Sequence, residues 1–279
     1  MIQFFTDLPA YSFLQAALLA GFLASLPAGV VGSLIVVRRS SYIAGAISHC
    51  VLGGMGAARY FQVVYGLEWM TPLAGAVVAS LVGATIIGLA TIYMKERADS
   101  VMSIVWAVGM ALGISFVMKT PGYGQDLMSY LFGNILMVSG TDLLLMAILD
   151  IIILVLTLLF YNRILAICFN EEAARVRGVP VGFYTMLMFM LIALTTVLLV
   201  QVVGIVLVIA LLSIPAATIA PFTRKLSFMM IGATILCFIL IFAGLVISYS
   251  PELPAGATII ELAGATYLVS LFFRKWKRK

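Results

Sequence analysis

Residues 184–222 decide the fold class: they run YTMLMFMLIALTTVLLVQVVGIVLVIALLSIPAATIAPF without a single charged side chain. A helix that crosses a membrane needs about 20 mostly apolar residues, so this stretch is long enough for two crossings. The rest of the chain is similar, because 64% of its 279 residues are hydrophobic and only 10% are charged. A soluble core of this size cannot hide so much apolar surface. We therefore expect an all-α polytopic membrane protein with one transmembrane domain over residues 1–279.

The charges exclude other classes of protein. The formal net charge is +5, from 16 Lys and Arg against 11 Asp and Glu, but the basic residues fall in short clusters between apolar runs, as in cytoplasmic loops of membrane proteins. We therefore expect contact with membrane lipid and no nucleic-acid partner. The three cysteines, Cys50, Cys168 and Cys237, are odd in number and widely spaced, which argues against a disulfide framework.

Nine apolar stretches are long enough to span a membrane. The division inside 184–222 is the least distinct, so the expected number is nine, or eight without that division. The predicted spans are 14–36, 42–61, 71–94, 101–118, 139–161, 184–203, 204–222, 227–248 and 256–273.

The basic clusters predict the topology. If every cluster is cytoplasmic, an even number of spans must separate neighbouring clusters, and nine spans satisfy this condition. The stretch 184–222 must then cross twice, with a tight outer turn near Gln201–Gly204, although a re-entrant pair would satisfy the same parity. The amino terminus, which lacks the basic region of a signal peptide, is expected outside and the carboxyl terminus in the cytoplasm. The clusters are Arg38–Arg39, Lys95–Arg97, Arg163–Arg177, Arg224–Lys225 and Arg274–Lys279.

Four polar side chains inside the predicted spans are candidates for a metal or translocation pathway, because such residues are costly in a membrane and commonly functional. His49 is the only histidine, and imidazole both binds metals and relays protons. Cys50 offers a thiolate for a soft metal, and Asp150 and Glu261 offer carboxylates. Each also has a structural explanation: a neutral imidazole or protonated carboxyl bonded between helices, or a thiol that only packs.

An enzyme is not expected. The sequence contains neither an HExxH zinc motif nor a GxxxxGK[ST] phosphate loop, and Ser48 and His49 are adjacent, so they point in different directions on a helix. ATP hydrolysis, if the protein depends on it, would belong to a separate subunit.

The longest predicted inner loop covers residues 169–179 and has the pattern of a short helix. Asn170 can cap its amino terminus, with Glu171 and Glu172 in the first turn, and Gly178 can end it. A capped helix between two spans suits docking onto a soluble partner, although a connector on the membrane surface would look similar. The residues expected to carry the docking are Asn170, Glu171, Glu172, Ala173, Arg175 and Gly178.

Six blocks, in order along most of the chain, carry a family resemblance. They are GSLIVVRRSSYIAGAISHCVLGG at 32–54, ERAD at 96–99, SYLFGNIL at 129–136, NEEAARVRG at 170–178, VGIVLVIALLSIPAATIA at 203–220 and LPAGATII at 253–260. Together they resemble the permease subunit of the metal-ion ABC importers of the ABC-3 type, which carry zinc, manganese or iron(II).

The resemblance implies a homodimeric pore in a bacterial cytoplasmic (inner) membrane. It also implies two copies of a cytoplasmic ATP-binding subunit on the 170–178 loops and an extracytoplasmic metal-binding protein. No cofactor is expected to be bound permanently, because the divalent metal is the cargo, and His49 corresponds to the family histidine that contacts it. The family has an aspartate four residues earlier, where this chain has Gly45. Carboxylate ligands suit manganese more than zinc, so zinc is the first expectation and manganese or iron(II) the next.

Two other functions stay open at this stage. One is a proton-coupled secondary transporter of a cation or small solute, with His49 and Asp150 as a relay and no ATPase. The other is a membrane scaffold or enzyme, for which residues 170–178 would be dispensable.

Overall fold

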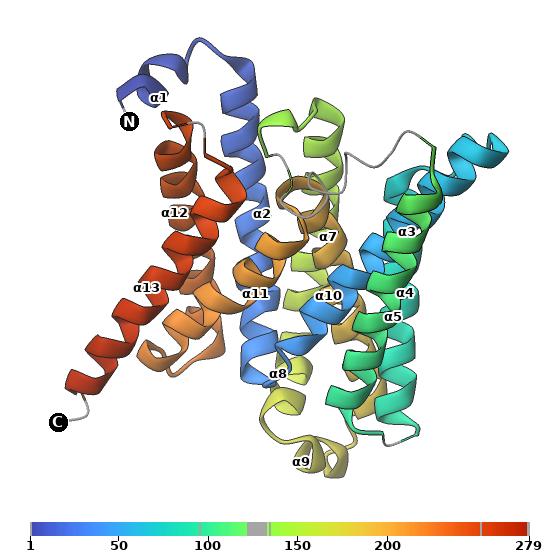
Figure 1. The fold of residues 1–279 in the computed structure, drawn as a ribbon. Coiled ribbons are helices and arrows are strands. Elements are labelled where there is room, and N and C mark those ends of the chain that lie inside the picture. The colour runs from blue at the N-terminus through green and yellow to red at the C-terminus, as the bar shows by residue number, and fades with distance from the viewer. Residues whose placement is uncertain (1, 95, 122–132, 134, 252, 278–279) are drawn as a thin grey trace.

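The chain is a bundle of helices in the computed structural model, which describes residues 2–94, 96–121, 133, 135–251 and 253–277 (Figure 1). Within these ranges every regular element is helical. The elements are α1 (Ile2–Asp7), α2 (Ser12–Val37), α3 (Tyr42–Tyr65), α4 (Pro72–Ile92), α5 (Ala98–Lys119), η1 (Ile135–Met137), α7 (Gly140–Leu159), α8 (Tyr161–Phe169), α9 (Glu171–Val176), α10 (Val181–Val203), α11 (Ile205–Ile219), η2 (Ala220–Phe222), α12 (Leu226–Tyr249) and α13 (Ala255–Lys277).

Each of the nine predicted spans coincides with one of these long helices to within a few residues at its ends. Among the described residues, eight helical segments are long and apolar enough to cross a membrane. The remaining predicted span is α3, which has 24 residues but includes His49, Arg59 and Gln62 and is therefore less apolar. The all-α polytopic fold predicted from composition and spacing is confirmed.

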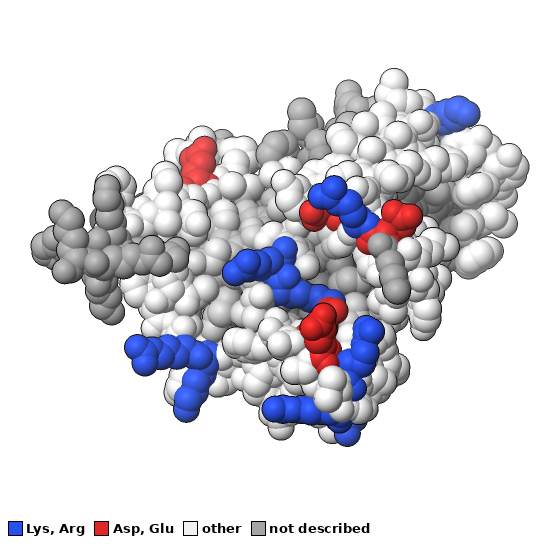
Figure 2. All heavy atoms as spheres, turned by 90° about the horizontal axis from the view of Figure 1, so that it is seen from below, with Lys and Arg blue, Asp and Glu red and all other residues white. Residues whose placement is uncertain are grey.

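The long helices run alternately up and down, so the two ends of the chain lie at opposite ends of the bundle (Figure 1). The described basic clusters all lie in connections that Figure 1 places at the lower end, which Figure 2 shows from below. This is the arrangement that the even-number argument predicts. The described basic residues in these clusters at the lower end are Arg38, Arg39, Arg97, Arg163, Arg175, Arg177, Arg224 and Lys225.

The charge-free stretch 184–222 divides at a single residue. α10 ends at Val203 and α11 begins at Ile205, and Gly204 between them has φ 79° and ψ 165°. A positive φ is readily adopted only by glycine, so the break occurs at the one residue of the predicted turn that permits it. α11 then descends from the upper end of the bundle (Figure 1), and the predicted double crossing is confirmed.

Several buried hydroxyl groups inside the spans are satisfied by their own helices, whereas those of Thr157 and Thr185 have no partner among the described residues. The side chains of Ser33, Ser48 and Thr195 each donate to the backbone carbonyl four residues earlier, at 2.7, 2.7 and 2.8 Å. This local bond lets a hydroxyl enter an apolar environment without a partner on another helix. These hydroxyls therefore hold no helices together.

The closest helix contact that concerns the candidate site joins α3 to α5. A Cβ added at Gly53 would lie 2.9 Å from the carbonyl oxygen of Gly109, and one added at Gly109 would lie 2.9 Å from the backbone nitrogen of Cys50. Small residues let helix backbones approach in this way, which increases van der Waals contact where no hydrophobic effect operates.

Replacing Gly109 with alanine should lower stability, because the added methyl group meets rigid backbone. Overpacking of this kind costs about 1–3 kcal/mol, and we expect a lower melting temperature in detergent. The matched control is Gly264→Ala in α13, where an added Cβ meets nothing within 4 Å. Equal melting temperatures for the two variants would contradict the α3–α5 packing.

Candidate functional site

His49 belongs to α3, and its side chain lies between α3 and α5. Its side chain is buried, with 8% exposed, and its ring stacks on the indole of Trp106 with centroids 4.6 Å apart and planes 25° from parallel. The Nδ1 atom is buried without a hydrogen-bond partner among the described residues. A buried polar atom of this kind calls for an explanation.

Gly45 lies one turn before His49 on α3 and faces the indole ring of Trp106. A Cβ added there would lie 2.3 Å from Cζ3 of Trp106 and 2.9 Å from Cη2. The indole therefore occupies the space that any side chain at position 45 would enter. This gives the departure from the family pattern at Gly45 a physical reason.

Trp106 is the neighbour of His49 that the sequence analysis did not single out. Tryptophan is enriched where a span meets the membrane surface, whereas Trp106 lies well inside α5. Its unusual depth within the span is the one feature of the sequence that could have drawn attention to Trp106. Nothing in the sequence, however, indicates which of the other helices it contacts.

Cys50 is turned away from the histidine toward α4 and α5. Its thiol lies 3.9 Å from the carbonyl oxygen of Val105, and its Sγ would lie 3.0 Å from a Cβ added at Gly83. With these neighbours it lines an almost wholly apolar groove of about 410 Å³. The structure thus gives Cys50 a packing environment.

Asp150 is buried in α7, with 2% exposed, and neither carboxylate oxygen has a hydrogen-bond partner among the described residues. α7 packs mainly against α2 and α10, whereas α3 packs mainly against α4 and α5. Similar depth in the membrane therefore does not bring Asp150 to His49. A pathway role for Asp150 stays a prediction.

Glu261 is exposed on α13, which packs against α11 and α12. Figure 1 shows α13 on the left of the bundle and α3, α4 and α5 on the right. Within the part of the chain that the structure describes, no three His, Cys, Asp or Glu side chains come together as a metal site. The four candidate residues thus do not form one cluster within this chain.

A cavity of about 440 Å³ lies at the upper ends of α3, α4, α7 and α10. Among the described residues that line it, the one carboxylate is Asp142, which accepts a hydrogen bond from Gln201 at 2.8 Å and completes a capping box with Ser139. Met55, two turns along α3 from His49, also lines this cavity. The block 129–136 that the sequence analysis singled out reaches it through Gly133, but most of that block lies outside the described residues.

The predicted short helix of the inner loop is confirmed as α9. The side chain of Asn170 accepts a hydrogen bond from the backbone of Ala173 at 2.9 Å, and Gly178 follows the helix with φ 77°. Ala174 is buried in a small cluster with Ile167, Val181 and Tyr184. One face of α9 is therefore fixed to the bundle and the other is free.

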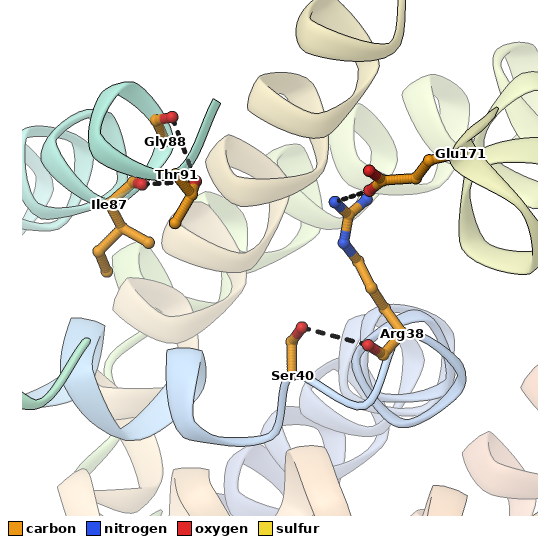
Figure 3. Close-up of polar contacts among 6 residues, drawn as sticks. All are labelled: Arg38, Ser40, Ile87, Gly88, Thr91 and Glu171. Carbon is orange, nitrogen blue, oxygen red and sulfur yellow. Dashed lines mark hydrogen bonds and ion pairs between the residues drawn. The ribbon is translucent and has the colours of Figure 1, made fainter. Parts of the chain in front are cut away.

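The inner helix is also tied to the end of α2. Arg38 donates to the carboxylate of Glu171 at 2.5 Å (Figure 3). The guanidinium of Arg38 also lies 5.9 Å from the ring centroid of Phe189 in α10. Arg39 follows with φ 57°, which is rare for a residue other than glycine. The short connection from α2 to α3 thus begins at Arg38, the residue whose ion pair with Glu171 contacts α9.

The free face of α9 carries both charge and apolar surface. Glu172 and Arg175 are exposed, as expected. Val176 of α9 and Phe169, the last residue of α8, are also exposed, at 88% and 70%, on the lower end of the protein. The sequence analysis did not single out these two apolar residues, although apolar groups beside charged ones suit a protein partner.

Comparison with known proteins now adds to this geometry. A model of the ABC 3 transport family matches residues 10–274. The chain belongs to the ABC-3 family. It is 42% identical over 275 residues to an uncharacterized membrane protein of Synechocystis, which covers 99% of this chain and 95% of the relative.

Two further relatives carry more informative names. The ABC-3 protein is 34% identical to the manganese transport system membrane protein MntC of Halalkalibacterium halodurans over 270 residues, covering 97% of this chain and 90% of the relative. It also matches a chain in the structure of PsaBC from Streptococcus pneumoniae in complex with Fab. That match has a TM-score of 0.84 and 33% identity and covers 97% of this chain and 95% of the other.

The meeting of Arg38 and Glu171 beside Cys168 can be tested by thiol chemistry. Cys168 lies in α8, outside the candidate spans, and burial raises the pKa of its thiol to about 11, while Arg38 lowers this pKa and Glu171 raises it. The reactive form is the thiolate, so alkylation should be slow at pH 8 and accelerate as the pH rises toward 11. Arg38→Ala should slow it further, and Glu171→Gln should accelerate it.

The alkylation rate is measured against pH with Cys50 and Cys237 replaced by alanine, so that one thiol remains. If the three proteins react at the same rate at pH 8, the two charged groups do not act on the thiol.

Proposed function

We propose that this ABC-3 protein is the permease subunit of an ATP-driven importer of divalent metal ions in a bacterial cytoplasmic membrane. The observation that carries the proposal is the match along almost the whole chain to a relative named for manganese transport and to a chain of PsaBC. The chain supplies the route through the membrane. ATP is hydrolysed by two copies of a separate cytoplasmic subunit, so this chain is not an enzyme.

The lower end of the bundle is the cytoplasmic end in this proposal. Basic residues gather in its connections (Figure 2), and the positive-inside rule assigns such loops to the cytoplasm. The amino terminus then lies outside and the carboxyl terminus inside. An extracytoplasmic metal-binding protein delivers the ion to the upper end, where the cavity beside Asp142 lies.

His49 contacts the cargo in this proposal. It is buried within the membrane-spanning bundle, and its Nδ1 has no partner among the described residues. A titratable group kept at that depth points to a functional site. Zinc is the first cargo to test because imidazole suits it, and the relative named for manganese makes that ion its main competitor.

The pore is formed with a second copy of the chain. Less than a third of the span is buried inside the protomer in each of α5, α7 and α13, and the apolar faces left over must be covered by lipid or by another helix. The alternative of a proton relay between His49 and Asp150 receives no support, because their helices pack mainly against different neighbours.

Uptake by sealed vesicles tests the function directly. The vesicles contain this chain with the ATPase and binding protein encoded beside it, and they receive zinc, manganese and iron(II) in competition. We expect ATP-dependent accumulation of one metal above the others. Assembled complexes that accumulate none of the three would overturn the proposal.

In the same assay His49→Ala should reduce uptake at least tenfold, whereas Ser48→Ala, which removes only a bond within α3, should leave it close to normal.

The free face of α9 is the docking surface for the ATP-binding subunit, and charge reversal tests this assignment. Glu172→Arg should reduce co-purification of that subunit severalfold, because the residue is exposed and its replacement adds a repulsive charge. Glu68→Arg makes the same exchange at the opposite end of the bundle and is the control. Equal yields of the ATP-binding subunit with both variants would contradict the docking assignment.

A further inference from the structure

We propose that Trp106 is a positioning residue for His49 and sets the metal preference of the permeation site. This inference rests on the proposed function and deepens it. It starts from three residues that the packing of α3 against α5 brings together: Gly45 and His49 on α3, and Trp106 on α5.

The first step concerns the imidazole. Its ring lies nearly parallel to the indole, 4.6 Å from it, and a flat partner of this size restricts rotation about both side-chain bonds. No hydrogen bond to another described residue holds Nδ1. The stacking contact is therefore what fixes the direction in which the imidazole nitrogens point.

The second step concerns the space around the ring. Residues 45 and 49 are four apart and share one face of α3, so a side chain at 45 would be the natural second ligand for an ion at His49. Trp106 removes this possibility, because its ring atoms lie 2.3 to 3.0 Å from where a Cβ at Gly45 would be. An indole is rigid, and relief of this contact requires the whole ring to move.

The third step concerns the cargo. Among the described residues of each protomer, His49 contacts the aromatic face of Trp106 and no recorded contact is with a carboxylate, while the thiol of Cys50 is directed toward Val105. Imidazole suits zinc, whereas carboxylate oxygens suit manganese. Trp106 thus favours divalent ions that accept nitrogen ligands over ions that demand oxygen, and it does so by excluding an oxygen ligand.

Uptake competition between zinc and manganese tests the preference. Trp106→Phe keeps a flat ring and should retain most of the wild-type ratio of zinc to manganese uptake. Gly45→Asp alone should reduce uptake of both ions, because the carboxylate collides with the indole. Adding Trp106→Ala to Gly45→Asp should restore uptake and move the ratio at least tenfold toward manganese. An unchanged ratio in the double variant would overturn the proposal.

A second measurement tests the positioning of His49 independently of transport. His49 is the only histidine of the chain, so carbethoxylation by diethyl pyrocarbonate, followed by mass spectrometry of a protein without a histidine tag, reports on this one ring. Trp106→Ala should raise the rate severalfold by uncovering the imidazole, and Trp106→Phe should raise it less. The control Trp69→Ala removes an exposed tryptophan near the upper end and should have no effect.

The two measurements separate the possible failures. A wild-type complex that transports no metal, with a reactivity that still depends on Trp106, would refute the proposed function and keep the positioning role. Normal wild-type uptake with equal reactivity in all variants would refute the role of Trp106 and keep the proposed function.

Discussion

The backbones of α3 and α5 touch because glycines at positions 53 and 109 leave no side chains between them. Gly45, His49 and Gly53 follow one another at four-residue spacing and therefore share a face of α3, while Trp106 and Gly109 share a face of α5. The close approach of the two glycines brings the aromatic rings one turn away into contact. Separation of the helices by the width of a side chain would leave His49 without its stacking partner and remove the need for glycine at position 45.

The sequence predicts how deep each residue lies in the membrane, but it does not predict which neighbouring helix the side chain of that residue faces. The spans follow from runs of apolar residues and from the parity of the basic clusters, and even the break at Gly204 could be placed near its true position. Cys50, Asp150 and Glu261 are candidates because their side chains can bind a metal and because they fall inside predicted spans. The structure turns Cys50 toward α4 and α5, buries Asp150 where α7 meets α2 and α10, and leaves Glu261 exposed.

The inner loop shows the same division between local and long-range information. The cap at Asn170 and the end at Gly178 are local signals, and both were predicted. The bond between Arg38 and Glu171 joins segments that are distant in sequence, and many basic residues at this end could have been the partner. An ion pair with Glu171 about half exposed contributes only about 0.2–1 kcal/mol, so its consequence is geometrical: it fixes the inner helix relative to α2.

The same bond has a consequence for the order in which the protein is made. Its two residues are 133 positions apart, and α3, α4, α5 and α7 are synthesised between them. Arg38 therefore emerges early and waits without Glu171 while four helices enter the membrane. This ionic contact between α9 and α2 adds to the packing of Ala174 and forms only when those helices have brought α9 back to Arg38, so an intact Arg38–Glu171 pair is itself a sign that the first half of the bundle has assembled.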